Sequence, residues 1–146
     1  MNPTESTLQN PAVVAGKTAF RGLIIAYWIV TGLFCLEMCI TAHYELAILP
    51  QAAQVFARLG FTSGYFRVEL SWAKVVGVAA LLLPMVPSRL KEWAYAGFAI
   101  NLLSALVAHF SMGDGPAALA PSTITSALWA LSYYFWRRLQ ATPARA

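Results

Sequence analysis

Four long apolar runs, separated by short polar segments, set the pattern of this chain. They cover residues 20–42, 66–84, 93–112 and 121–136. About 20 consecutive apolar residues are enough for one helix to cross the hydrocarbon core of a bilayer. The pattern therefore predicts an all-α fold, an integral membrane four-helix bundle, with a single transmembrane domain over residues 20–136.

The longest connection, residues 43–66, contains a shorter helical pattern. Four apolar residues recur there at positions i, i+3, i+4 and i+7, namely Ala52, Val55, Phe56 and Leu59. This spacing gives a helix one apolar face. Pro50 opens the segment and Gly60 ends it. We expect a short amphipathic helix at the membrane surface between the first two spans, serving either as a connector or as a lid over a site.

The composition agrees with a membrane location. Hydrophobic residues make up 59% of the 146 residues and charged residues 11%, whereas a soluble domain is about 25% charged. The formal net charge of +4 comes from basic residues that flank the apolar runs. We therefore interpret the positive charge as a membrane-topology signal and expect no nucleic-acid partner.

The distribution of Lys and Arg predicts the orientation. With four spans, one side carries seven basic residues: Lys17, Arg21, Arg89, Lys91, Arg137, Arg138 and Arg145. The opposite side carries Arg58 and Arg67. Because the basic side of a membrane protein faces the cytoplasm, residues 1–19 and 137–146 are expected to be cytoplasmic tails. This describes a multi-pass protein of the bacterial inner (cytoplasmic) membrane, surrounded by membrane lipids.

Ionisable residues inside the apolar runs are the candidate site. Such residues are costly in hydrocarbon and by default indicate function. With a helical rise of about 1.5 Å per residue, Glu37 and His109 lie about 24 Å and Lys74 about 22 Å above the inner surface. Three titratable groups on three helices at one height predict a polar cluster in the outer half of the membrane.

Other polar and aromatic residues are expected to surround this cluster. Glu69 and Asp114 should lie at the outer rim, and Asn101 should lie below, near the midplane. Trp72 and Tyr44 complete the candidate substrate contacts. Trp72 also fits a simple packing role, and Asn101 also fits a hydrogen bond between helices.

The cluster also has a purely structural interpretation. Lys74 and Glu37 can form an ion pair that only fixes how the helices pack. His109 can equally be a hydrogen-bonded core histidine. Glu37 shares one stripe of the first helix with Thr41, Tyr44 and Glu45.

A metal or haem site is a weaker alternative. Cys35, Cys39 and His43 follow each other at i, i+4 and i+8 on one stripe of the first helix, and thiolate and imidazole are ligands for soft metals. His109 could then complete a haem site within the four helices. However, His43 should lie about 9 Å higher than His109, too far along its helix to share one site. We therefore predict no metal site.

Two segments carry a resemblance to a known family. They are WAKVVGVAALLLP at 72–84 and RLKEWAYAGFAINLLSALVAHFSMGDG at 89–115. The chain resembles the DoxX-like family of small four-helix bacterial membrane proteins over most of residues 27–136. The resemblance implies a four-helix membrane fold. The wider relatives are described as membrane subunits of redox systems, including quinone-linked sulfur oxidation.

The first functional hypothesis is an enzyme without a cofactor that acts on an apolar small molecule entering from the lipid. The chemistry would be acid–base: isomerisation, cyclisation or hydrolytic ring opening. Glu37 would be the general acid or base, with His109 as its partner, oriented by Asp114. Lys74 would stabilise developing negative charge or hold Glu37 ionised, and Asn101 would position the substrate.

The second hypothesis is a non-catalytic membrane subunit of a redox complex. It would bind quinone, or anchor a soluble redox partner protein, through the outer polar mouth. A purely structural anchor is the third. Because four short helices enclose little volume, a homodimer with a shared pocket is compatible with each of these.

Overall fold

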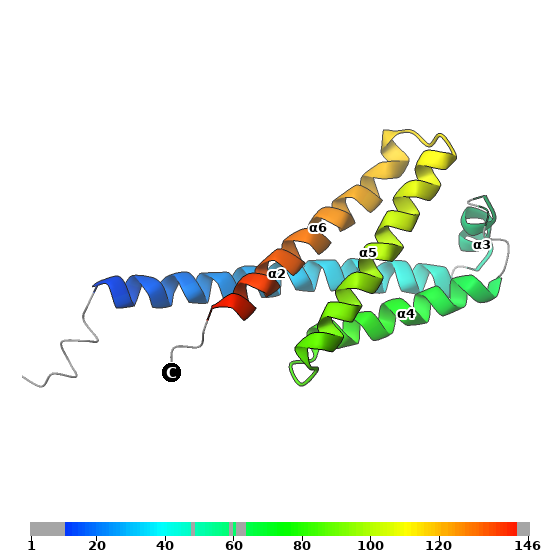
Figure 1. Cartoon of the computed structure of the whole chain (residues 1–146). Coiled ribbons are helices and arrows are strands. Elements are labelled where there is room, and N and C mark those ends of the chain that lie inside the picture. The colour runs from blue at the N-terminus through cyan, green and yellow to red at the C-terminus, as the bar shows by residue number, and fades with distance from the viewer. Residues whose placement is uncertain (1–10, 48, 59, 61–63, 143–146) are drawn as a thin grey trace, which may run out of the picture.

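The computed structural model describes residues 11–47, 49–58, 60 and 64–142. Within these ranges the chain is all-α, as predicted, and contains no strand (Figure 1). The helices are α2 (Pro11–Ala47), α3 (Leu49–Arg58), α4 (Gly64–Leu82), α5 (Ser88–Ser111) and α6 (Pro116–Ala141).

The four long helices contact each other in a ring. Helix α2 packs against α4 and α6, and α5 packs against the same two helices, so α2 and α5 are diagonal to each other. In Figure 1 the α5–α6 pair runs obliquely to the α2–α4 pair. The short helix α3 lies against α2 and α4. Both described ends of the chain lie away from α3 (Figure 1).

The first and last long helices of the chain, α2 and α6, are longer than the apolar runs from which they were predicted. Helix α2 begins at Pro11 rather than near residue 20, and α6 spans Pro116–Ala141 rather than 121–136. Proline is well suited to the first turn of a helix, where its missing N–H is not needed. The apolar pattern identifies the part of a helix that fits a membrane, whereas the helix itself continues beyond it. Of the predicted tail 1–19, residues 1–10 lie outside the described residues.

Two glycines form turns that other residues would adopt at a cost. Gly60, after α3, has φ = 88°, and Gly113, after α5, has φ = 68°. Glycine has no Cβ and adopts this left-handed region readily, so it commonly ends helices. The predicted end of the amphipathic helix at Gly60 is therefore present, and Gly113 forms the corresponding turn after α5.

The interior contains aromatic and aliphatic side chains from all four long helices. The buried core cluster comprises Tyr27, Phe34, Cys35, Met38, Val78, Leu81, Tyr95, Phe98, Leu102 and Trp136. A buried hydroxyl chain crosses it, since Ser132 Oγ lies 2.7 Å from both Thr31 Oγ1 and Tyr95 Oη. These bonds join α2, α5 and α6 inside the apolar core.

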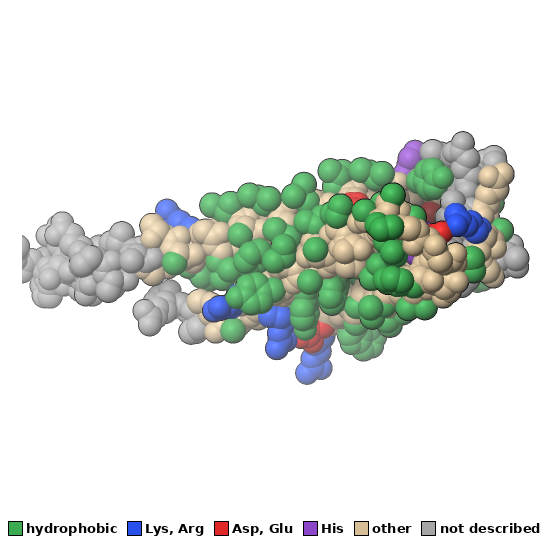
Figure 2. All heavy atoms as spheres, turned by 90° about the horizontal axis from the view of Figure 1, so that it is seen from above, with side chains coloured by type: hydrophobic (Ala, Val, Ile, Leu, Met, Phe, Trp, Pro, Cys, Tyr) green, Lys and Arg blue, Asp and Glu red, His purple; other side chains and the backbone are tan. Residues whose placement is uncertain are grey.

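The exterior is largely apolar. Figure 2 shows hydrophobic side chains over most of the visible face, with basic side chains toward its margins. Large apolar residues such as Ile40, Val76 and Ile100 are more than half exposed. Among the described helices, two segments, Gly16–Ala47 and Ser88–Ser111, are long and apolar enough to cross a membrane. Exposed apolar surface on this scale indicates contact with lipid rather than water.

Two basic residues donate hydrogen bonds to backbone carbonyls at the C-terminal ends of neighbouring helices. Neither α2 nor α4 has a basic residue in its last turn. Arg67 of α4 donates a hydrogen bond to the carbonyl of Glu45 near the end of α2. Lys91 of α5 donates to the carbonyl of Leu81 near the end of α4, at 3.0 Å. The unpaired carbonyls and negative dipole of each helix end thus receive a cation from the next long helix in the chain.

Candidate functional site

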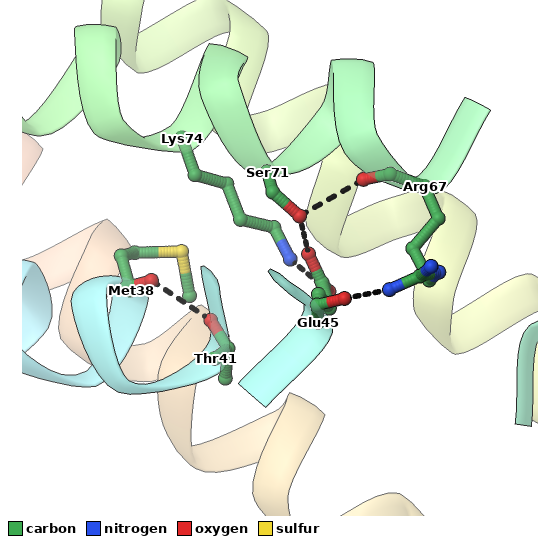
Figure 3. A network of polar contacts seen from close by, with 6 residues as sticks. All are labelled: Met38, Thr41, Glu45, Arg67, Ser71 and Lys74. Carbon is green, nitrogen blue, oxygen red and sulfur yellow. Dashed lines mark hydrogen bonds and ion pairs between the residues drawn. The ribbon is translucent and has the colours of Figure 1, made fainter. Parts of the chain in front are cut away.

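The densest polar contact lies between α2 and α4 (Figure 3). We call it the Glu45 cluster; it consists of Glu45, Arg67, Ser71 and Lys74. The three α4 residues are spaced i, i+4 and i+7, which puts them on one helix face. That face is buried against α2, and all four residues are buried.

Lys74 forms an ion pair with Glu45. Its Nζ lies 2.5 Å from Glu45 Oε1, and Ser71 Oγ donates to Glu45 Oε2 at 2.8 Å. Each carboxylate oxygen therefore has a donor. A buried charge pair of this kind is tolerated only while both partners remain, because removal of one leaves the other charge uncompensated.

The pairing differs from the predicted cluster of Glu37, Lys74 and His109. In the described part of the chain, no hydrogen bond or ion pair joins these three residues to each other. Lys74 contacts Glu45 instead, eight residues beyond Glu37 on α2. Height along a helix does not specify which face a residue occupies or where two helices cross. The sequence did contain one signal for the observed pair, because Glu45 lies on the same polar stripe of α2 as Glu37.

Glu37 has a partner on α6. Thr125 Oγ1 donates to Glu37 Oε1, and it also lies 2.8 Å from the carbonyl of Pro121. Glu37 is partly buried and Thr125 is buried. The contact gives Glu37 a neutral partner that links α2 to α6. Its role as an acid or base remains a prediction.

His109 and Asp114 are in contact, as the sequence led us to expect. The Nδ1 atom of His109 lies 2.7 Å from Asp114 Oδ2. An ionised carboxylate only accepts hydrogen bonds, so Nδ1 carries the hydrogen. Arg58 of α3 binds the other carboxylate oxygen, Oδ1. Asp114, whose side chain is 6% exposed, therefore tethers α3 to the turn between α5 and α6.

We expect this tether to depend on pH. The hydrogen bond from His109, together with the charge of Arg58, lowers the pKa of Asp114 below its ordinary value of 3.8, although partial burial opposes this. The folded pKa lies below the unfolded one. The stabilisation is therefore complete above pH 3.8 and is lost as the pH falls through the folded pKa.

Hydrogen exchange of residues 49–58 at decreasing pH measures this effect. As the pH is lowered below 3.8, the protection of α3 in the wild type should decrease before that of α6. In Asp114→Asn, protection of α3 should be weaker at neutral pH and should show no such step. Equal protection of α3 in both proteins across the range would contradict the tether.

An apolar groove of about 770 Å³ runs between α4 and α5. Four of the predicted site residues line it: Glu69, Trp72, Lys74 and Asn101. Trp72 is 58% exposed, so it forms an outer edge of the groove. Tyr44, Glu37, His109 and Asp114 do not line it. The structure thus divides the predicted site into a groove and polar contacts outside it.

Gly77 and Phe98 bring the two walls of the groove together. A Cβ atom on Gly77 would lie 2.7 and 2.8 Å from two ring atoms of Phe98. The ring is buried and contacts Phe34 edge to face, with the centroids 5.0 Å apart. The ring therefore has little freedom to move away, and any residue larger than glycine at position 77 displaces it.

The cysteines do not form a disulfide. Cys35 is buried, and Cys39 is exposed. Among the residues that the structure describes, no group of three or more His, Cys, Asp or Glu side chains is arranged to hold a metal ion.

Comparison with known families agrees with this architecture. The model of the DoxX-like family matches residues 29–131. The chain belongs to the DoxX-like family. The matched region of this DoxX-like membrane protein contains α4 and α5 in full, and with them the groove and the Glu45 cluster. Searches of the curated proteins and of the solved structures found no match.

Proposed function

We propose that this DoxX-like protein binds a lipophilic small molecule in the α4–α5 groove. The observation that carries the proposal is the division of the groove into an apolar part and a polar end. Leu83, Val86, Leu90 and Trp93 line it near the turn between the two helices. Its charged and amide side chains, Glu69, Lys74 and Asn101, lie farther from that turn.

The position of Asn101 follows from the antiparallel pairing. Gly77 approaches Phe98 across the groove. Lys74 is three residues before Gly77, and Asn101 is three residues after Phe98. The two side chains therefore stand at the same height, about 4.5 Å of helix beyond the close approach. A molecule with an apolar body and one oxygen-bearing end fits this arrangement, because an ammonium and an amide can bind the oxygen.

The proposal includes a membrane topology. Helices α2, α4, α5 and α6 would span the bacterial inner membrane with both termini in the cytoplasm, and α3 would lie at the outer interface. The exposed apolar side chains support four lipid-facing helices. The basic residues, seven on one side and two on the other, support the orientation. The groove would then open toward the lipid, from which an apolar ligand can enter.

Acid–base catalysis on the bound molecule is the second candidate function. It is favoured by the position of Lys74, which lines the groove and also pairs with Glu45. A carboxylate and an ammonium at the polar end can exchange a proton with a ligand. In this version Glu45, rather than Glu37, is the carboxylate coupled to Lys74. A redox subunit would use the same groove to hold a quinone, without turnover.

Mass spectrometry of small molecules that co-purify with the detergent-solubilised protein tests the proposal. The blocking variant is Gly77→Ala, because its new methyl group displaces Phe98 where both residues line the groove. The matched control is Gly32→Ala, whose new methyl group meets no atom within 4 Å. Both changes also replace a helical glycine by alanine, so their effects on helix propensity are equal.

We expect the wild type and Gly32→Ala to retain one lipophilic molecule that Gly77→Ala loses. A recovered quinone would favour the redox subunit, and chemical conversion of an added recovered molecule would favour the enzyme. Identical bulk phospholipid in all three proteins would overturn the proposal.

A further inference from the structure

We propose that Arg67 binds an anionic oxygen group, a phosphate or a carboxylate, at the α3 end of the protein. This site is separate from the groove, because Arg67 does not line it. The proposal goes beyond the function proposed above and does not depend on it.

The Glu45 cluster contains more positive than negative charge. Arg67 and Lys74 contribute two cations, whereas Glu45 contributes one carboxylate. Both oxygens of that carboxylate are already used, by Lys74 and by Ser71. Within the described residues, the side chain of Arg67 donates a hydrogen bond to the backbone carbonyl of Glu45 and to no carboxylate. A buried net positive charge is unfavourable unless an anion joins it.

The other acidic side chains within the described ranges have partners elsewhere or face another way. Asp114 binds Arg58 and His109, and Glu92 binds Arg137. Glu37 accepts a hydrogen bond from Thr125 of α6. Glu69 is two residues after Arg67, about 200° around the helix, and lines the groove. None of them supplies a counterion to the guanidinium of Arg67.

The guanidinium itself has unused donors. It carries five N–H groups, and the residue is 6% exposed. One terminal nitrogen donates to Glu45, while the buried Nε has no partner in the described part of the chain. An orphaned buried donor on a charged group is costly. Guanidinium nitrogens present parallel N–H bonds that match the oxygens of a carboxylate or phosphate.

The position of Arg67 suggests where such an anion comes from. Arg67 is in the first turn of α4, beside the end of α2 and close to α3. In the proposed topology this end lies at the outer surface of the inner membrane, where lipid phosphates and dissolved anions both occur. A lipid headgroup and free phosphate therefore offer the same chemistry to this site.

A role limited to capping α2 makes a different prediction. The end of α2 carries a partial negative charge equivalent to about half an elementary charge, which Arg67 contacts through one bond. If capping were its whole role, added anions would change nothing beyond their general effect on ionic strength.

Thermal unfolding in neutral detergent, with added ligand, separates these roles. The probes are inorganic phosphate and phosphatidylglycerol, with chloride at matched ionic strength as the reference. Arg67→Gln is the test variant. Arg89→Gln is the control, because Arg89 is exposed and at the opposite end, next to the α4–α5 turn.

We expect phosphatidylglycerol or phosphate to raise the Tm of the wild type and of Arg89→Gln, and the affinity to fall about tenfold or more in Arg67→Gln. A response to both probes identifies a free-anion site, and a response to the lipid alone identifies a headgroup site. A wild-type response no larger than that to chloride, or an equal response in Arg67→Gln, overturns the proposal.

A conservative variant covers the case in which Arg67→Gln does not fold. Arg67→Lys keeps the positive charge but loses the forked donor geometry. We expect it to fold and to bind more weakly than the wild type to whichever probe, phosphate or phosphatidylglycerol, raises the wild-type Tm. Unchanged affinity in Arg67→Lys would show that the forked geometry is not used and would overturn the assignment to Arg67.

Discussion

Glu45→Gln is expected to lower the free energy of unfolding by about 3–5 kcal/mol. Glu45 is the only carboxylate bonded to Lys74 within the described residues, and both side chains are buried. The substitution leaves Lys74 as an uncompensated ammonium and Arg67 as a second nearby cation. The effect should therefore greatly exceed that of losing one neutral hydrogen bond, which averages about 0.6 kcal/mol between membrane helices.

A double-mutant cycle with Lys74→Met measures the pair. Unfolding in mixed micelles should show that the double variant is more stable than Glu45→Gln, because removing both charges is less costly than removing one. Glu37→Gln is the matched control, since it removes a carboxylate whose described partner is the hydroxyl of Thr125. If the cycle instead gave an interaction energy between Lys74 and Glu37 and none between Lys74 and Glu45, the ion pair predicted from height along the helices would be correct.

Tyr95→Ala should cost a similar amount, about 3–5 kcal/mol, for a different reason. Tyr95 is 1% exposed. Its ring lies 5.2 Å from that of Tyr133 and 5.5 Å from that of Trp136, centroid to centroid. Removing the ring opens a cavity between α5 and α6 that the surrounding aromatic side chains can fill only in part.

Tyr95→Phe separates the ring from its hydroxyl. This variant retains the aromatic contacts and loses the hydroxyl that bonds Ser132, so its cost should be about 0.6–1.7 kcal/mol. Unfolding followed by tryptophan fluorescence compares the two variants, since Trp136 reports on this part of the core. If Tyr95→Phe were as damaging as Tyr95→Ala, the hydroxyl chain rather than aromatic packing would hold the helices together.

The sequence predicted the helices better than their contacts. Apolar runs located the four long helices, and the i, i+3, i+4, i+7 spacing located α3, because both patterns depend on local periodicity. The groove residues Lys74 and Asn101 came together because α4 and α5 are consecutive and joined by a short turn, which fixes their antiparallel register. Height along the helices had placed Asn101 below Lys74, near the midplane, whereas the close approach of Gly77 to Phe98 makes the two residues level.

Height was not sufficient between helices that are diagonal in the ring. Glu37 lies on α2 and His109 on α5, and these helices are not direct neighbours. Where they approach in the core, the aromatic rings of Phe34 and Phe98 meet. Rotation about each helix axis and the order of helices around the ring decide such contacts, and neither is specified by counting residues from the membrane surface.

The basic residues that complete neighbouring helix ends bear on how the protein enters its membrane. Helix α2, inserted alone, would present the carbonyl of Glu45 without Arg67, and α4 would present that of Leu81 without Lys91. In each case the missing donor arrives with the next long helix, α4 for α2 and α5 for α4. Unsatisfied backbone groups are costly in lipid. We therefore expect neighbouring long helices to enter the bilayer more readily as pairs than singly.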